Sequence, residues 1–542
     1  MTFCLLCFRF RPVINSAGPA NPTAKASIGV NCACAESAAL VLQGRRQMIC
    51  WVVPSDFQMN FSRLITPLKH ASCYLWILLG VALVLRLGTF IFFPSIYWPD
   101  EIFQTQEAGH RLAYGYGVVP WEYRLGLRSW VLPAFIAVIM KFTSWIGSGS
   151  SGYLLGIALC FSLLSLAVAW FAFVWCRDYL GVEYAFLAAF MTATWFELVH
   201  FGPRALNEFV AGNILLPTVY LGSLKSEQQP ESKWRLFAVG LLLGLVVCLR
   251  IQFGPAVLLT GLWIMSRDWK GRFAPVSLGI ILMVLIFGAV DALTWSWPFY
   301  SYYAFFTENI VHHRAAGFGV LPWYYFISAL FFHTGPLLIF AVLAVRRSPI
   351  LGWIALAVLF PHLLIGHKEF RFIYPVLPIV LILAAIGIID FLRFLDQKMA
   401  LRMTSAVRIL IAAGFVTVCS LTLASQFPRW DKARGPLQAF SRLSNDQQAC
   451  GVALVTVPWA NTGGYTYLHR HIPIFVFGNF TDAQSVSRSF NRIVAPEASV
   501  MPLQGFSLTN CQNGECVYQR GGDCEAGGFG FEINEYLKSR GE

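Results

Sequence analysis

The sequence predicts an α-helical protein that crosses a membrane many times, and its composition carries that prediction. Hydrophobic residues make up 57% and charged residues only 13% of the 542 residues, and the mean hydropathy is +0.60. Soluble domains carry about 25% charged residues, because their surfaces face water. The chain also contains 46 Phe and 18 Trp. We therefore expect lipid to be the solvent for most of the protein surface.

The net charge of +12 does not indicate a nucleic-acid partner. The basic residues fall in short runs between apolar stretches, which is the positive-inside pattern of membrane proteins. The 14 Cys show no zinc-ligand spacing. Composition therefore favours a membrane protein and removes most of the case for nucleic-acid binding.

Residues 1–58 differ from the rest of the chain. They contain no apolar span, no clear amphipathic period and no signal-peptide layout. From Met59 the chain soon enters a clean apolar stretch. We interpret Met59 as the start of the protein and residues 1–58 as a disordered or mis-assigned leader, with a targeting segment as the alternative.

A helix needs about 20 apolar residues to cross a bilayer, and about eleven segments between residues 59 and 425 come near this length. These segments are 73–93, 151–175, 184–199, 209–224, 236–250, 253–265, 275–290, 322–345, 351–364, 373–391 and 407–424. Residues 59–425 are therefore predicted to form the transmembrane module, with large loops at 94–150 and 291–321.

The further apolar stretch 129–145 decides the predicted topology. With a cytoplasmic amino terminus and this stretch lying in the interface or re-entering, the basic runs fall inside, as the positive-inside rule requires. These runs are Arg177, Lys225/Lys233/Arg235, Arg267/Lys270/Arg272, Arg346/Arg347 and Arg393/Lys398/Arg402. As a full span, the same stretch would turn all of them outward. The segments predicted to lie outside are 94–150, 200–208, 291–321, 365–372 and 426–542.

Residues 426–542 form the longest of these outer segments. Runs 451–457 and 472–477 look like strands within a mixed composition, so we expect a small α/β extracytoplasmic domain. An oxidising compartment would allow a disulfide among Cys511, Cys516 and Cys524, and the sequence leaves the pairing open.

The first outer loop contains adjacent carboxylates, Asp100 and Glu101, directly after the first span. Such a pair at the membrane surface suits a general base or a metal site. The alternative is that both residues merely begin a helix after Pro99, where the helix dipole favours acidic side chains.

A basic cluster formed by His367, Lys368 and Arg371 lies at the outer end of another span. This exception to the positive-inside rule suggests a bound anion, and phosphate suits the geometry of Arg and Lys. Arg86, within the first span, and Arg250, at a span end, are further candidates for a phosphate partner. The alternative is contact with lipid headgroups.

Few carboxylates fall at mid-span, where an ion-coupled carrier needs them, and no internal repeat stands out. Asp291, which closes one span and opens the second large outer loop, belongs to the same outer face. These positions favour a surface enzyme acting on a lipid-linked phosphate substrate over a transporter or flippase.

Several motifs resemble one enzyme family. They are Tyr-Trp-Pro-Asp-Glu-Ile-Phe-Gln at 97–104, Tyr-Gly-Tyr-Gly at 114–117, Trp-Glu-Tyr at 121–123, Leu-Arg-Ser-Trp at 127–130 and His-Lys-Glu-Phe-Arg-Phe-Ile-Tyr-Pro-Val-Leu-Pro at 367–378. The chain resembles, over about residues 71–480, the polyprenyl-phosphate-mannose-dependent mannosyltransferases of the GT-C fold. This family holds the ALG and GPI mannosyltransferases, and the third GPI mannosyltransferases look most similar.

The resemblance implies a reaction. The donor would be mannose β-linked to dolichyl or another polyprenyl phosphate, and the acceptor a hydroxyl of a lipid-linked glycan, such as a GPI precursor. Asp100, with Glu101 second, would deprotonate the acceptor, which attacks C1 opposite the phosphate. The product would be α-linked, with inversion.

The resemblance also implies roles for the polar residues. The candidates for binding the donor phosphate are His367, Lys368, Arg371, Arg86 and Arg250, and those for binding the rest of the substrates are Gln104, Trp121, Glu122, Arg128 and Asp291. No cofactor is required, because basic residues can neutralise the leaving phosphate, and no metal site is indicated, although a divalent metal is compatible. The expected partners are the donor, the glycan acceptor and membrane lipids.

The resemblance leaves the setting open. A eukaryotic protein would lie in the endoplasmic reticulum membrane with its carboxyl terminus in the lumen. A bacterial one would lie in the inner membrane and act on an envelope glycolipid. Transfer of another polyprenyl-linked sugar, and transport of a lipid-linked sugar, are the alternative functions.

Overall fold

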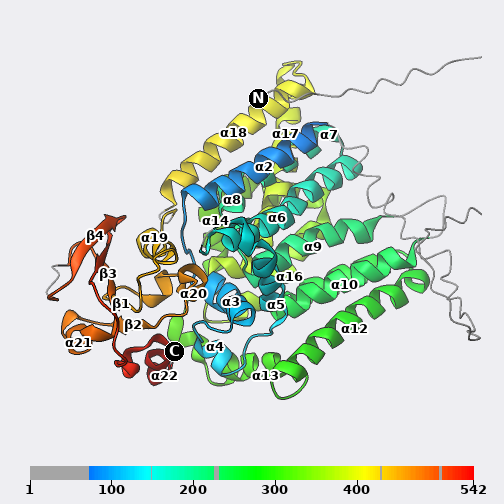
Figure 1. The fold of residues 1–542 in the computed structure, drawn as a ribbon. Coiled ribbons are helices and arrows are strands. Elements are labelled where there is room, and N and C mark those ends of the chain that lie inside the picture. The colour runs from blue at the N-terminus through cyan, green and yellow to red at the C-terminus, as the bar shows by residue number, and fades with distance from the viewer. Residues whose placement is uncertain (1–72, 148, 225–230, 428–429, 500–502, 542) are drawn as a thin grey trace, which may run out of the picture. The chain divides into compact units, whose positions relative to one another are not determined.

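The structure of the protein is a computed structural model that describes residues 73–147, 149–224, 231–427, 430–499 and 503–541. The predictions for residues 1–58 and for Met59 lie outside these residues. The described chain consists of a large helical part and, toward the carboxyl end, a mixed sheet with short helices (Figure 1).

Long apolar helices dominate the helical part. The helices long and apolar enough to cross a membrane are α2 (Cys73–Phe92), α6 (Ser151–Tyr179), α12 (Trp269–Thr294), α17 (Val376–Met399) and α18 (Ser405–Gln426). A sixth span arises if α14 (Tyr325–Thr334) and the segment Leu337–Arg347, which contains α15 (Leu337–Ala344), count as one span bent by 111°.

Shorter helices complete this part. They are α7 (Val182–Thr194), α8 (Phe196–Phe201), α9 (Asn207–Ser223), α10 (Lys233–Leu249), α11 (Gly254–Met265) and α16 (Pro349–Leu364). Every segment predicted as a span overlaps one or two of the helices, but two segments are broken, at Trp195 and at Gly335. By length and composition five or six of the described helices qualify as spans, so the count of about eleven stays a prediction.

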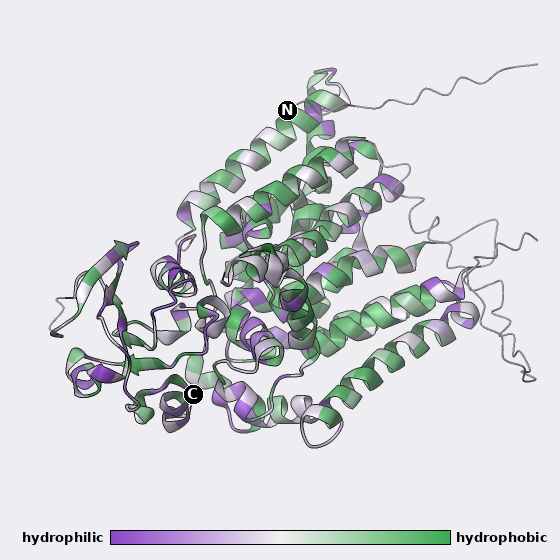
Figure 2. Ribbon diagram, in the orientation of Figure 1, coloured by the Kyte–Doolittle hydropathy of each residue, from purple (hydrophilic) through white to green (hydrophobic). Residues whose placement is uncertain are grey.

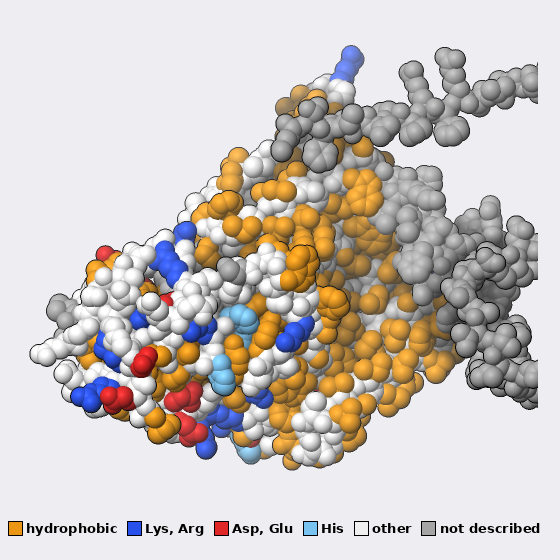
Figure 3. Space-filling model, viewed as in Figure 1, with side chains coloured by type: hydrophobic (Ala, Val, Ile, Leu, Met, Phe, Trp, Pro, Cys, Tyr) orange, Lys and Arg blue, Asp and Glu red, His pale blue; other side chains and the backbone are white. Residues whose placement is uncertain are grey.

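Hydrophobic residues dominate these helices (Figure 2), and hydrophobic side chains cover much of the face of the helical part drawn in Figure 3. Of the apolar 18-residue stretch in each helix, 78% is buried inside the protein in α17 but only 17% in α18. Side chains such as Leu343 and Leu410 are each 71% exposed. Exposed apolar surface on this scale needs a lipid solvent, and the helical part is that of a multi-pass membrane protein.

The stretch 129–145, expected to lie in the interface, forms the short helix α5 (Val131–Thr143). Thirteen helical residues extend only about 20 Å, which is less than the ~30 Å hydrocarbon core of a bilayer. The helix packs against α6 and against α3 (Glu107–Tyr114). The helices α7 and α11, which overlap predicted spans, are no longer than α5, so the placement of this stretch in the interface stays a prediction.

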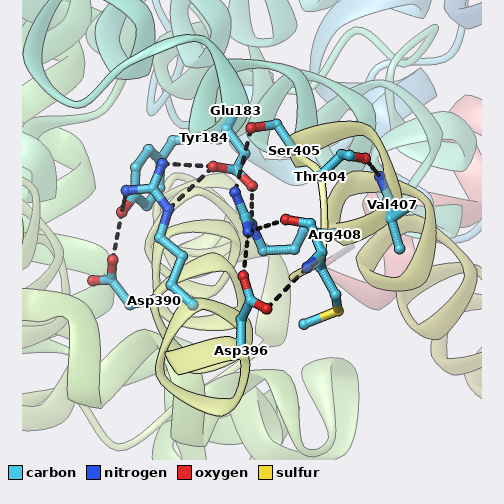
Figure 4. Close-up of polar contacts among 10 residues, drawn as sticks. Glu183, Tyr184, Asp390, Asp396, Thr404, Ser405, Val407 and Arg408 are labelled. Atoms are coloured by element: carbon cyan, nitrogen blue, oxygen red, sulfur yellow. Dashed lines mark hydrogen bonds and ion pairs between the residues drawn. The ribbon is translucent and has the colours of Figure 1, made fainter. Parts of the chain in front are cut away.

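An ion-pair network joins α7, α17 and α18 at the end of the helical part that lies away from the sheet (Figures 1 and 4). Glu183 accepts hydrogen bonds from Arg393, the shorter at 2.5 Å, and from Arg408 at 2.6 Å. Arg408 also donates to Asp396 at 2.8 Å. Arg347 and Arg393, from two of the basic runs predicted to be cytoplasmic, pair with Asp390 and Glu183 in this region.

The sheet near the carboxyl end has five strands in the order β2-β1-β3-β5-β4. The strands are β1 (Val452–Val455), β2 (Ile474–Phe477), β3 (Arg492–Pro496), β4 (Ser507–Gln512) and β5 (Glu515–Gln519). The first three are parallel, and β5 pairs antiparallel with β3 and β4. The two runs expected to be strands are β1 and β2. Short helices flank the sheet: α19 (Arg434–Leu443), α20 (Gly464–Leu468), α21 (Phe480–Ser485) and α22 (Ile533–Arg540).

Two disulfides cross-link this part, Cys511–Cys516 between β4 and β5 and Cys450–Cys524. Cys524 thus pairs with a cysteine that the sequence analysis had not considered for it.

A buried carboxylate, that of Glu107 in α3, ties the first loop to the sheet part. It accepts hydrogen bonds from the backbone N–H groups of Val118 at 2.7 Å, Tyr465 at 3.0 Å and Thr466 at 2.8 Å, and from the Thr466 hydroxyl at 2.6 Å. Burial raises the pKa of Glu107, and these hydrogen bonds oppose that shift. The first loop is therefore held against α20, and its position does not depend on the helical part alone.

Candidate active site

A cavity of about 740 Å³ lies between the first loop, the segment that follows α13 (Tyr300–Phe306) and the segment between α16 and α17. Its polar lining includes Asp100, Gln104, Glu122, Arg128, Arg250, Arg314, His367, Glu369 and Arg371. Its aromatic lining includes Trp98, Trp121, Phe305, Phe318, Phe372 and Trp459. The volume and the mixture of aromatic and convergent polar groups are typical of a small-molecule site.

Asp100 and Glu101 diverge because the chain turns into a helix immediately after Pro99. Successive helical residues point about 100° apart, so only one of the two carboxylates can face the cavity. Asp100 does so, and 28% of its side chain is exposed. A π-helical turn, Ile102–Gln106, follows and continues into α3; such turns are frequent at functional sites.

Glu101 points the other way and is only 2% exposed. Both of its carboxylate oxygens accept from Nη1 of Arg204 at 2.6 Å, and one also accepts from the Tyr97 N–H at 2.8 Å. Burial raises the pKa of Glu101, and Arg204 opposes that shift. The structure therefore does not bring Glu101 to the cavity as the second base, but gives it a partner in the protein interior.

Arg371 lies on a 3-10 turn, Phe370–Ile373, at the opposite wall. Its guanidinium forms ion pairs with Asp100 and, at 2.7 Å, with Glu369. Burial alone would raise the pKa of Glu369, but Arg371 and His367 outweigh burial and hold that pKa at about 2. In return, the Glu369 hydrogen bond raises the pKa of His367.

Glu208, in the first turn of α9, lies beneath the two arginines of this wall. It is 1% exposed and pairs with Arg250 at 3.1 Å and with Arg371 at 3.9 Å. The sequence analysis did not assign it to the site. The sequence feature that could have indicated Glu208 is the cluster of polar residues between two apolar segments, formed by Arg204, Asn207 and Glu208.

Glu122 and Arg128 form the third wall, where Arg128 pairs with Glu122 at 3.3 Å. Gln104 donates to the same carboxylate at 2.8 Å. Burial raises the pKa of Glu122, while Arg128 opposes that shift. Trp121, on the short helix α4 (Trp121–Arg124), lies under the guanidinium of Arg314, 4.7 Å from its ring centre.

Three other predicted site residues do not line the cavity. Arg86 is fully buried in α2 and donates to the Ser165 hydroxyl at 2.7 Å and to the Ala193 carbonyl at 2.9 Å. Lys368 donates to the Ile365 carbonyl. Asp291 accepts from the N–H of Ser301 at 3.0 Å and from its hydroxyl at 2.6 Å. In each case a nearby protein partner holds the polar group away from the cavity.

The cavity therefore has a carboxylate, Asp100, that can accept a proton at one wall, and two guanidinium groups, those of Arg250 and Arg371, that can bind an anion at the next, together with His367. Charge that develops on a leaving anion would meet these preorganised cations, which stabilise it. This arrangement suits the transfer of a group from a phosphate to a hydroxyl.

Comparison with known proteins finds similarity to mannosyltransferases. The sequence profile described as "Alg9-like mannosyltransferase family" matches residues 76–469. Proteins named GPI mannosyltransferase 3 are 28% identical in Yarrowia lipolytica, over 73% of this chain and 76% of the relative, and 25% identical in Trypanosoma brucei brucei, over 73% and 78%. GPI alpha-1,2-mannosyltransferase 3 of Mus musculus is 25% identical over 55% of this chain and 56% of the relative.

The fold is also similar to that of a solved structure. The crystal structure of ArnT from Cupriavidus metallidurans bound to undecaprenyl phosphate superposes with a TM-score of 0.53 and 12% sequence identity. The match covers 83% of this chain and 98% of ArnT.

Proposed function

The chain belongs to the Alg9-like mannosyltransferase family, and from this premise we propose that it transfers mannose from a polyprenyl-phosphate donor to a hydroxyl of a GPI-precursor-like glycolipid. The observation that carries the proposal is the pairing of Asp100 with Arg371 across the cavity. It brings a proton acceptor next to an anion-binding group. The names of the relatives from yeast, trypanosome and mouse support a GPI acceptor, and the ArnT complex supports a polyprenyl-phosphate ligand in this fold.

In the proposed reaction, the acceptor oxygen attacks C1 of mannose while its proton passes to the Asp100 carboxylate. The bond between C1 and the phosphate oxygen breaks, and its electron pair leaves with the polyprenyl phosphate. Attack from the face opposite the phosphate inverts C1, so a β-linked donor yields an α-linked product. A carboxylate is a suitable base here, because it has to accept the proton only as the new bond forms.

Arg371 and Arg250 would stabilise the charge on the leaving phosphate. Without substrate, Asp100 and Arg371 neutralise each other. A donor phosphate that binds Arg371 competes with Asp100 and releases this carboxylate to act as a base. The raised pKa of His367 favours a third positive charge at the same wall.

We further propose that no metal is required. The guanidinium groups supply the positive charge that a divalent cation would otherwise bring to the phosphate. Activity should therefore persist after treatment with EDTA, measured as product formed per unit time. A loss that Mg²⁺ or Mn²⁺ restores would contradict this part of the proposal.

The cavity and residues 426–542 are proposed to face away from the cytoplasm, with residues 59–425 as the transmembrane catalytic module and the amino terminus inside. Arg393 and Arg408, which pair with Glu183 at the end of the helical part away from the sheet (Figure 4), support this orientation through the positive-inside rule. The two disulfides support an oxidising compartment. In a eukaryotic cell this compartment is the endoplasmic reticulum lumen.

The test is a transfer assay in membranes that contain the full chain. Radiolabelled polyprenyl-phosphate-mannose is offered with a panel of glycolipids, including GPI precursors and bacterial envelope glycolipids. We expect a new lipid product that α-mannosidase degrades. Transfer only from a donor of another sugar would replace the mannosyl assignment, and movement of label across vesicles without a new glycosidic bond would refute an enzymatic function.

A further inference from the structure

A small side pocket of about 60 Å³ opens from the main cavity. The two share Gln104, Arg128, Arg250, Gln252 and Phe305. The side pocket adds polar groups that the main cavity lacks, namely those of Ser129, Asn207, Ser301 and Tyr302. It is a continuation of the proposed active site, on the side of α9, α10 and α13.

Several polar atoms around this pocket have no partner among the described residues. Nε of Arg128, Oγ of Ser129 and Nε of Arg250 are buried without a hydrogen bond. The side-chain amides of Asn207 and Gln252 are partly exposed and make no hydrogen bond to a described residue, so both can bind a ligand. Because buried polar groups are nearly always hydrogen-bonded, the unpaired buried atoms of Arg128, Ser129 and Arg250 around one pocket indicate a polar ligand.

The walls of the pocket are held in place by groups behind them. Asp291 holds Ser301 through its N–H and hydroxyl. The Tyr302 hydroxyl donates to the carbonyl of Cys248 at 2.7 Å. Arg250 pairs with Glu208 at 3.1 Å and lies 4.7 Å from the ring centre of Phe372. The pocket is therefore preorganised, and Asp291, predicted to bind substrate, acts on it only through Ser301.

The chemistry of the lining favours neutral hydroxyl groups over an anion. The amides of Gln104, Asn207 and Gln252 each offer a donor and an acceptor, and a hydroxyl uses both whereas a phosphate uses only donors. A pocket of this volume holds about two water-sized groups, which is the size of one edge of a sugar and not of its ring.

We propose that this side pocket binds hydroxyl groups of the transferred mannosyl residue, with Asn207 and Gln252 as residues that determine sugar specificity. The inference rests on the proposed function and deepens it. The reacting C1 stays in the main cavity between Asp100 and Arg371, and one edge of the ring enters the side pocket. A donor sugar that lacks the hydroxyl bound in the side pocket leaves these amides without a hydrogen-bond partner. This loss lets an enzyme discriminate strongly against such a sugar.

The test uses polyprenyl-phosphate donors that carry mannose or its 2-, 3-, 4- or 6-deoxy forms. It compares kcat/KM of the wild type with that of Gln252→Leu and Asn207→Leu, which remove the amide at similar volume. We expect the wild type to lose about 10- to 100-fold with one deoxy donor. Each variant should lose a similar factor with mannose but show little further loss with that same deoxy donor.

The matched control is Asn309→Leu. Asn309 lines the main cavity but not the side pocket, so this variant should keep the wild-type profile across the deoxy donors. The inference would be overturned if the Gln252 and Asn207 variants lost the same factor in kcat/KM with every deoxy donor as with mannose. It would also be overturned if the variants lost no activity at all. If the wild type transfers mannose but the inference fails, the proposed function stands. If the wild type transfers no mannose, both fail.

Discussion

At the scale of single residues, the adjacent carboxylates Asp100 and Glu101 show how much a side chain's direction decides. They share a motif and a charge, but Asp100 faces the cavity and Arg371, whereas Glu101 faces the interior and Arg204. A buried ion pair is costly to break from one side, at about 3–5 kcal/mol. We therefore propose that Asp100 takes part in the reaction and that Glu101 stabilises the first loop.

Substitution of Asp100 by Asn should lower kcat by about 10²- to 10⁴-fold, because the amide cannot accept the proton. The partly exposed position of Asp100 predicts little change in thermal unfolding. Initial rates of mannosyl transfer and the unfolding temperature are both measured in detergent. As the control, Glu101→Ala should unfold at a lower temperature. Wild-type turnover in the Asp100→Asn enzyme would exclude Asp100 as the base.

The pair of His367 and Glu369 predicts a pH dependence of stability. The hydrogen bond between the His367 ring and the Glu369 carboxylate raises the pKa of His367 in the folded protein. The folded chain therefore binds this proton more tightly than the unfolded chain, in which the pKa is about 6.5. The stabilisation is complete below that pH and is lost as the pH rises through the higher folded-state pKa.

In the His367→Gln variant this loss should be absent. Unfolding temperatures of both proteins, measured at a series of pH values above and below about 6.5, should therefore differ most at low pH and converge as the pH rises. A constant difference across the series would show that His367 does not titrate against Glu369.

At the scale of elements, the junction of α3 and α20 couples the first loop to the sheet part. Gly464 begins α20 with a φ of +58°, and a Cβ there would lie 3.0 Å from the Glu107 carboxylate. Two reasons favour glycine at this position. Residues with a Cβ disfavour the left-handed backbone conformation, and the Glu107 carboxylate leaves no space for a Cβ. The first loop, which carries Asp100, depends on this contact for its position.

Replacement of Gly464 by Ala should therefore destabilise the protein by at least about 1–2 kcal/mol, the cost of a left-handed conformation, and lower transfer activity with it. Gly478 is the matched control, because it precedes α21 with nothing within 4 Å of an added Cβ and without a positive φ. Thermal unfolding and resistance to proteolysis measure both variants. Equal stability of Gly464→Ala and Gly478→Ala would show that the junction is not tight.

At the scale of the whole molecule, polar groups divide between two ends of the helical part. Arg393 and Arg408 pair with Glu183 where α7, α17 and α18 meet (Figure 4), and the sheet lies toward the other end of the helical part (Figure 1). A membrane between these ends separates the predicted cytoplasmic loops from the proposed site. The orientation proposed for the enzyme follows from this division together with the positive-inside rule.

The sequon Asn479-Phe480-Thr481 tests that orientation. Asn479 is exposed and precedes α21, where its side chain accepts from the N–H of Asp482 at 2.9 Å. In a eukaryotic host we expect a glycan at Asn479 and none at the sequon of Asn60. The measurement is a mobility shift removed by an endoglycosidase and absent in Thr481→Ala. A glycan on Asn60, or labelling of a cysteine beside Asn479 from the cytoplasm, would reverse the topology and move the proposed site to the wrong face.

The sequence by itself determined the class of the protein and the location of its polar motifs. Hydropathy is a local property, so every predicted span overlaps a helix, and the motifs around Asp100 and His367 both contribute to the cavity lining. The breaks at Trp195 and Gly335 escaped prediction, because an apolar segment reads alike whether its helix is straight or bent.

Only the tertiary structure decided which polar side chains meet. Asp100 and Arg371 lie far apart in the chain and come together across the cavity, and Glu208 joins them from a third segment. Glu101, Lys368, Arg86 and Asp291 share the residue types of the site but face other partners. Each of these outcomes depends on the direction of a side chain and on the packing of distant helices, and neither is encoded in local residue order.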